Sequence, residues 1–408
     1  MRRTYNLFCF FLDKRNNWCY ISVIIRQNKK NRQEKRIMAQ EFPFKNKFAI
    51  GYYFHFPGKF MDTIRPYIPA LAEIYFPLPG ILSARELSGD EDAQRAQLVK
   101  DLRECRENGI KLDLLINATC YGEKSYTAAW RKTVEGAIEY LDSFGLKPEV
   151  VTTTSPFVAK SIKTRWPEID IRGSVNLKIG STLALEYVED LYDSFYMNRD
   201  LQRDIPTLKL FSEWCKAHGK KLCMLANSGC LRNCPTQVFH ETLLAHGFWR
   251  AGNERNRMKQ SPTLCMQLIT EQNKYEEILR QTWVRPEDLH YYDPYVEVFK
   301  LSTRDPSLDV PTILKAYCNG KWDGDLCEII DPRVVEGLRG KIIDNSAFPE
   351  DWVTSGIAGI CAVNCTHCGK CTEVLEKVLK VNPDYKPPIE EQFTMNLSGL
   401  TIGQYSFK

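Results

Sequence analysis

The sequence has no apolar run long enough to cross a membrane. Two apolar runs near its beginning, Leu7–Leu12 and Cys19–Ile25, are flanked by basic residues, but a membrane-spanning helix needs about 20 apolar residues. No small-residue cleavage site of the kind that ends a secretory signal follows either run. The sequence therefore predicts a cytoplasmic protein without membrane spans.

The common peptidase motifs are also absent. A His-Glu-x-x-His zinc peptidase needs two histidines on one helical face, and the nearest stretch, His240-Glu241 with His246, turns the second ring away from the first. There is no Gly-x-Ser-x-Gly elbow. These absences argue against a metal-independent peptidase. His240 and His246 are expected to be helix-surface or loop residues, and of the two His240 is the better candidate for contact with a cluster or substrate.

Most of the chain lacks strong basic charge. The net charge is +4 at pH 7, but residues 1–37 hold ten Lys or Arg side chains against Asp13 and Glu34, so residues 38–408 sum to −4. This balance does not predict a strongly basic nucleic-acid surface. Residues 1–37 are expected to be a basic extension, either a disordered arm or an over-extended start before Met38.

Cysteine, by contrast, is abundant, with 15 residues. Many of them fall into a central group and a terminal group: Cys223, Cys230 and Cys234, then Cys361, Cys365, Cys368 and Cys371. A disulfide-rich protein is usually secreted, and no secretory signal is found. The spacing therefore predicts reduced thiols that serve as metal ligands.

From Phe48 onward, short apolar runs alternate with amphipathic stretches, the pattern of a parallel sheet covered by helices. The predicted strands are Phe48–Phe54, Glu73–Phe76, Leu112–Ile116, Glu149–Thr153, Ile169–Val175, Ser194–Tyr196, Lys221–Ala226 and Val296–Lys300. The clearest helical patterns are Asp92–Glu107, Ala128–Phe144, Pro156–Trp166, Ser181–Leu191 and Ile205–His218. They predict an α/β fold, a (β/α)8 TIM-type barrel over residues 41–310, with a cysteine-rich C-terminal extension over 311–408.

The reactive face of such a barrel is formed where its strands end. Polar residues follow most predicted strands: His55, Asn117, Cys120, Thr153, Thr154, Asn176, Asn198, Arg199, Asp200, Asn227, Cys230, Cys234 and Arg304. Each alone could be a turn or capping residue, but together they predict a polar mouth. Arg199, Arg285, Lys300 and Arg304 are expected to bind an anionic substrate there, the alternative being that each is ion-paired at the surface.

Two cysteine motifs predict the cofactor. Cys230 and Cys234 form a C-x3-C pair after the seventh strand, and Cys361–Cys371 reads C-A-V-N-C-T-H-C-G-K-C, which resembles a ferredoxin cluster loop. We expect one or two 4Fe-4S clusters. The predicted ligands, grouped separately or shared, are Cys230, Cys234, Cys361, Cys365, Cys368 and Cys371. Zinc held by four thiolates is the alternative, and the late position of the run argues against a radical-SAM enzyme.

Five segments resemble the collagenase-like peptidase family U32 over roughly residues 48 to 310. They are Ser174–Gly180, Tyr196–Leu201, Asn227–Pro235, Trp283–Leu289 and Phe299–Arg304. Members are labelled peptidases, yet several resemble iron-sulfur proteins of oxygen-independent hydroxylation of RNA bases or quinone precursors. The resemblance implies that Cys230 and Cys234 bind a cluster, that Cys223 or Cys265 adds a ligand, and that Lys300 and Arg304 are the family's basic pair.

The chain also departs from this family. The family motif Lys-Ile-Glu-Gly-Arg appears as Lys-Leu-Ser-Thr-Arg at Lys300–Arg304, so its acidic residue is lost, and the run Cys361–Cys371 is an addition. The sequence predicts an iron-sulfur modifying enzyme acting on an anionic small molecule or RNA, with Arg199, His240, Lys300 and Arg304 as catalytic candidates. A peptidase, or a non-catalytic iron-sulfur assembly subunit, remains the alternative, and a partner subunit could complete the site.

Overall fold

The computed structural model describes residues 41–53, 59–84, 90–246, 263–355 and 368–386. The predicted N-terminal extension, His55, Cys361 and Cys365 lie outside these ranges. The chain divides into two compact units, Met1–Phe42 and Pro43–Lys408. All that follows concerns the second unit.

A closed barrel of eight parallel strands, in chain order, is the centre of this unit. Its strands are β1 Phe48–Gly51, β2 Leu71–Phe76, β3 Lys111–Ile116, β4 Val150–Thr153, β5 Asp170–Gly173, β6 Ser194–Tyr196, β7 Lys221–Leu225 and β8 Val298–Leu301. Every predicted strand is present, with its ends shifted by a few residues at most. The predicted (β/α)8 barrel is confirmed.

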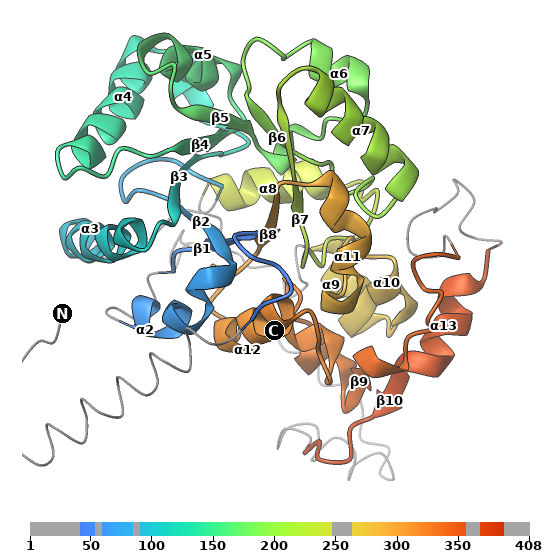
Figure 1. The fold of residues 1–408 in the computed structure, drawn as a ribbon. Helices are drawn as coiled ribbons and strands as arrows, with labels where there is room; N and C mark the ends of the chain where they lie inside the picture. Colours follow the sequence, from blue (N-terminus) through green and yellow to red (C-terminus); the bar gives the residue numbers. More distant parts are fainter. Residues whose placement is uncertain (1–40, 54–58, 85–89, 247–262, 356–367, 387–408) are drawn as a thin grey trace, which may run out of the picture. The chain divides into compact units, whose positions relative to one another are not determined.

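Helices surround the strands (Figure 1). Those between β1 and β7 are α2 Phe60–Ile64, α3 Glu91–Glu107, α4 Ala128–Asp142, α5 Pro156–Arg165, α6 Thr182–Glu186 and α7 Ile205–Ala217. Side chains cap several of their N-termini: Asp90 accepts from two backbone N–H groups of α3, and Thr127 and Ser155 each accept from one in α4 and α5. These caps fix the residue at which each of the three helices begins.

Two parts of the helical pattern differ from expectation. The predicted helix Ser181–Leu191 is shorter, because α6 ends at Glu186 and turns follow it. The described part of the excursion between β7 and β8 holds four α-helices that the pattern did not predict: α8 Gln237–Ala245, α9 Leu264–Met266, α10 Glu276–Leu279 and α11 Leu289–Tyr292. Except for α8 they are a single turn long, too short to show an amphipathic period.

The C-terminal part packs against the barrel and its excursion. The helix α12 Val310–Asn319 contacts α2, on the outside of the barrel. Further along, β9 Lys341–Ile343 pairs antiparallel with β10 Leu379–Val381, and α13 Lys370–Val378 contacts α10. The cysteine-rich extension therefore lies beside the β7–β8 excursion. No helix in the described ranges is long and apolar enough to cross a membrane.

Candidate active site

The barrel interior is unusually charged for this fold, whose centre is normally filled by branched apolar side chains. Arg172 of β5 forms a bidentate ion pair with Glu73 of β2, with Nη1–Oε2 and Nη2–Oε1 distances of 2.5 and 3.0 Å. These strands are not neighbours, so the pair spans the interior. Both side chains are almost fully buried, Arg172 at 1% and Glu73 at 2% relative exposure.

A second carboxylate, Asp113 of β3, joins this pair. Its oxygens accept hydrogen bonds from the backbone N–H and the hydroxyl of Thr152, and Oδ2 lies 3.9 Å from Arg172 Nη1. Burial raises the pKa of Asp113, and the charges of Arg172 and Lys300 oppose that rise. The buried network therefore contains two carboxyl groups, those of Glu73 and Asp113, and one guanidinium, that of Arg172, which is paired with Glu73.

Lys300 of β8 is a further charged residue of the barrel interior. Its Nζ lies 3.9 Å from the ring centre of Tyr75 in β2 and 4.9 Å from that of Tyr196 in β6, and contacts across three separate strands place the amine inside the barrel. Burial lowers the pKa of Lys300 to about 7, opposed by Asp113 and reinforced by Arg304 and Arg172. Within the described ranges, Lys300 forms no ion pair within 4.0 Å.

Arg304 lies close to Lys300, three residues beyond the end of β8. Its guanidinium carbon is 5.6 Å from the centre of the Tyr75 ring. A Cβ added at Gly51 would come within 2.5 Å of Arg304 Cγ and 2.6 Å of Tyr75 Cε2, so glycine is needed for these side chains to pack. The predicted basic pair, Lys300 and Arg304, is thus assembled around one tyrosine ring.

The thiol loop after β7 forms a second cluster at the mouth. Arg199, which follows β6, donates from Nη1 to Cys230 Sγ at 3.1 Å, and from Nη2 to Asn176 Oδ1 at 2.6 Å and Glu241 Oε1 at 3.0 Å. Burial raises the pKa of Cys230, and the Arg199 guanidinium opposes this. Arg199 is therefore engaged with protein groups, including the thiol, and does not extend into the mouth as a simple anion-binding side chain.

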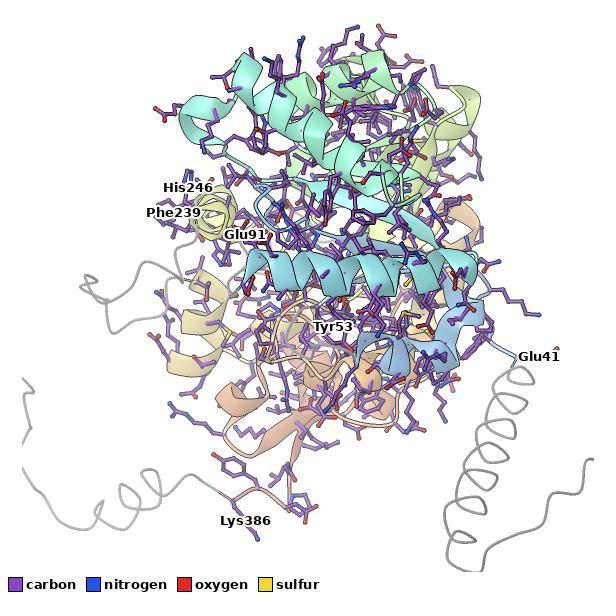
Figure 2. The ribbon with its side chains drawn as sticks, turned by 90° about the vertical axis from the view of Figure 1, so that its left-hand side faces the viewer. Glu41, Tyr53, Glu91, Phe239, His246 and Lys386 are labelled. Atoms are coloured by element: carbon purple, nitrogen blue, oxygen red, sulfur yellow. The ribbon has the colours of Figure 1, made fainter. Side chains whose placement is uncertain are left out.

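Helix α8 covers part of the mouth. Its Glu241 pairs with Arg199 after β6, and its Thr242 lies 3.4 Å from Thr119 after β3. Figure 2 shows α8, marked by Phe239 and His246, at the same end of the barrel as Glu91, where α3 begins. The predicted residue His240 lies on this helix, next to Glu241, and is partly buried.

The remaining central thiols occupy two different environments. Cys265, in α9, is close enough to Cys230 and Cys234 for their charges to add to the rise that burial causes in its pKa, to about 11. Cys223 instead lies in the barrel interior with Tyr75 and Tyr196, where burial raises its pKa to about 12 and Arg172 opposes the rise. Of the two predicted additional ligands, Cys265 therefore lies near the C-x3-C pair and Cys223 lies in the core.

The fit of these thiols to a metal cluster is partial. Cys265 lies close to Cys230 and Cys234, and thiols bind a metal ion only in their deprotonated form. In the described ranges, however, no three Cys, His, Asp or Glu side chains converge closely enough to hold a metal ion by themselves. Further ligands would have to come from the terminal run, of which Cys368 is exposed and Cys371, at the start of α13, is partly buried.

Several other predicted mouth residues maintain the local fold. Asn117 Oδ1 accepts from the backbone N–H of Ala84, and Asn198 Oδ1 accepts from that of Asp200. Asn227 bonds to the backbone of Ser302 on both sides of its amide. Arg285 forms a buried bidentate pair with Asp288, at 2.7 Å for both bonds, so it is ion-paired within the excursion.

Sequence reasoning missed the interior of the barrel. Glu73, Tyr75, Asp113, Arg172 and Tyr196 all lie within strands whose sequences are otherwise mostly apolar. The signal that could have found them is a charged residue at an inward position, as in L-A-E-I-Y-F, K-L-D-L-L-I and D-I-R-G. Alternation in a strand brings such residues to the same face as the core.

Comparisons with known proteins complete the description. No family model matches the chain. An uncharacterized protease, MJ1657 of Methanocaldococcus jannaschii, is 26% identical over 289 residues, 70% of this chain and 82% of that protein. The solved structure of the U32 peptidase Mk0906 is 14% identical with a TM-score of 0.47, over 65% of this chain and 96% of the other.

A Lactobacillus plantarum alpha-amylase structure is 8% identical with a TM-score of 0.33, over 66% of this chain and 72% of that chain. The M. jannaschii relative covers most of both sequences, and the sequence motifs lie within the barrel that the structure describes. The predicted resemblance of this chain to the U32 peptidase family is confirmed.

Proposed function

We propose that this chain is an iron-sulfur enzyme that modifies an anionic substrate at the barrel mouth. The observation that carries the proposal is the contact of the buried Arg199 guanidinium with Cys230 Sγ at 3.1 Å, with Cys265 nearby. The Arg199 guanidinium opposes the rise that burial causes in the pKa of Cys230, so it lowers the cost of forming the thiolate, which is the form that binds iron. At Cys318, a buried thiol of α12, burial alone raises the pKa and no cation in the described ranges opposes it.

Cys230, Cys234 and Cys265 would hold the cluster from the barrel side, and the terminal run from Cys361 to Cys371 would provide the other thiolates. The contact of α13 with α10 supports this grouping, because α13 contains Cys371 and α10 belongs to the excursion. When bound, such a cluster supplies one-electron transfer or an open iron coordination site.

The residues of the chain itself would bind and orient the substrate. Lys300 and Arg304 place two positive charges near the Tyr75 ring at the end of β8, where they would bind a small anionic group. A small anionic molecule is favoured over RNA, because residues 38–408 carry a net charge of −4 and a long polyanion needs an extended basic surface. Arg199 would keep the thiol loop in place.

The test begins with protein prepared without oxygen. Iron, sulfide and zinc are measured for the unmodified chain, for the double variant Cys230→Ala/Cys234→Ala and for Cys365→Ala/Cys368→Ala. We expect brown protein that dithionite bleaches, and loss of iron in both double variants. Cys318→Ala, a buried thiol outside the barrel, is the matched control and should keep all its iron.

The pattern of iron loss also separates the groupings. Loss of the same four irons in both double variants would indicate one shared 4Fe-4S centre, and loss of different irons would indicate two. Colourless protein with stoichiometric zinc would refute the redox proposal and make the terminal run structural. Brown protein that shows no turnover with any reductant would favour an assembly subunit.

The second candidate function is proteolysis, favoured by the name of the M. jannaschii relative. It is tested by hydrolysis of gelatin and a broad peptide library with cluster-free protein. Robust hydrolysis that one point substitution abolishes would replace the proposed function with a peptidase. Absence of hydrolysis, with iron present, supports the modifying enzyme.

A further inference from the structure

The barrel interior contains one cation whose position is not explained by ion pairing. Buried charges are normally paired, because desolvation of an unpaired ion costs several kcal/mol. Arg172 meets this expectation through its bidentate contact with Glu73. Lys300 has aromatic rings on two sides instead and no carboxylate within 4.0 Å in the described ranges, and it retains some accessible surface.

We propose that Lys300 is a nucleophilic amine that forms an imine with a carbonyl substrate bearing a carboxylate or phosphate group. The geometry supports this directly. Nζ lies between the Tyr75 and Tyr196 rings, and the guanidinium of Arg304 lies over the same Tyr75 ring. Lys300 Nζ and the Arg304 guanidinium carbon lie 3.9 and 5.6 Å from the centre of the same Tyr75 ring. The two cations are therefore less than about 10 Å apart, a distance that a short oxo acid spans.

The step balances without any added oxidant or reductant. The lone pair of the neutral amine attacks the carbonyl carbon, and the carbonyl oxygen takes up a proton to give a carbinolamine. Loss of that oxygen as water then forms the C=N bond, so the amine gives up both of its N–H protons overall. The Tyr75 and Tyr196 rings exclude water from two sides of the amine.

Whether the amine is neutral depends on every charged group that faces it. These groups are Glu73 and Tyr75 of β2, Asp113 of β3, Arg172 of β5, Tyr196 of β6, Cys223 of β7 and Arg304 after β8. The rings and carboxyl groups favour the ammonium form, whereas burial and the guanidinium groups favour the neutral amine. Burial prevails and lowers the pKa of Lys300 to about 7.

This inference deepens the proposed function by naming its substrate class, and it rests on that function only for placing the substrate at the barrel mouth. The test uses the full chain, glyoxylate as the anionic aldehyde and sodium cyanoborohydride, which reduces an imine to a stable carboxymethyl amine. Labelling rates of individual lysines are read by peptide mass mapping from pH 6 to 9, and iron content is measured on the same sample.

We expect Lys300 to be labelled at pH 7 at least about tenfold faster than the exposed Lys132 and Lys321. A lysine with an ordinary pKa is neutral in only about one molecule in 2,500 at that pH, whereas about half of the Lys300 amines would be neutral. Part of this advantage is offset because less basic amines are weaker nucleophiles.

Lys300→Arg keeps the positive charge and removes the nucleophile, so it should abolish only the fast label. Labelling of Lys300 no faster than that of the exposed lysines would overturn the inference and leave Lys300 as a permanent cation, whether or not the protein contains iron. Fast labelling of iron-free protein would uphold the amine and refute the cluster separately. If the Arg variant does not fold, the rates in the unmodified chain still decide.

Discussion

Removal of the Arg172 guanidinium is expected to destabilise the barrel severely. Arg172→Leu would leave Glu73 at 2% and Asp113 at 0% exposure without the cation that lies 2.5 and 3.9 Å from their oxygens. Each carboxylate was desolvated on folding, and in the variant neither recovers that cost through an ion pair. The substitution itself adds no bulk, because leucine is smaller than arginine.

The magnitude follows from the burial of the pair. Removing one partner of a buried ion pair typically costs about 3 to 5 kcal/mol. The double variant Glu73→Leu/Arg172→Leu leaves no unpaired member of the pair, so it should cost less than the sum of the two single changes, with a coupling of at least about 1 kcal/mol. Glu73→Leu alone should cost less than Arg172→Leu, because Asp113 remains near the guanidinium.

The assay is urea unfolding at pH 7, followed by circular dichroism, for both single variants and the double variant. A matched control is the exposed pair of Lys209 and Glu213 on α7, separated by 3.8 Å with side chains 57% and 59% exposed. Lys209→Ala should change the free energy of unfolding by less than about 0.5 kcal/mol. A cost below about 1 kcal/mol for Arg172→Leu, or strictly additive single changes, would refute the assigned pairing.

Two further predictions concern other parts of the unit. Gly51→Ala should destabilise the protein by about 1 to 3 kcal/mol and slow the labelling of Lys300, because the added Cβ displaces Tyr75 and Arg304. Thermal unfolding measures the first effect and peptide mapping the second, and a variant with unchanged stability and labelling would contradict the packing at the mouth. Burial raises the pKa of Asp325 to about 6, above its unfolded value, so its contribution to stability is lost as the pH rises from about 4 through 6. Asp325→Asn, which keeps the acceptor for the N–H groups of Cys327 and Ile343, should therefore raise the Tm at pH 8 and leave it unchanged at pH 4; equal shifts at both values would contradict a buried charge.

The barrel could be predicted because its strands are short apolar runs separated by well-capped helices. Runs such as Val150–Thr153 and Lys221–Leu225 are bounded by turn residues, and capping residues such as Thr127 and Ser155 mark where the next helix begins. The small helices of the excursion could not be predicted in this way. Tertiary contacts hold α9, α10 and α11, and a single turn carries no periodicity.

The candidate site was predicted unevenly for a similar reason. Thiol spacing is a local property, so the pair Cys230 and Cys234 is visible in the sequence. The network of Glu73, Asp113 and Arg172 depends on which strands face one another across the barrel, and only the closed strand order supplies that information. Lys300 was predicted as a cation, but its aromatic surroundings come from β2 and β6, which are far from it in sequence.

The C-terminal extension is a structural part of the mouth. The backbone N–H of Gly229 donates to Asp331 O at 2.5 Å, the N–H of Asp331 donates to Asn227 O at 2.9 Å, and the Ser302 hydroxyl donates to the Asp331 carboxylate. A Cβ at Gly229 would lie 3.0 Å from Asp331 O, so any larger residue would push the Asp331 backbone away. Asp331 thereby joins the loops after β7 and β8. Because Cys230 is the next residue after Gly229, the position of this thiol depends on the extension as well as on the barrel.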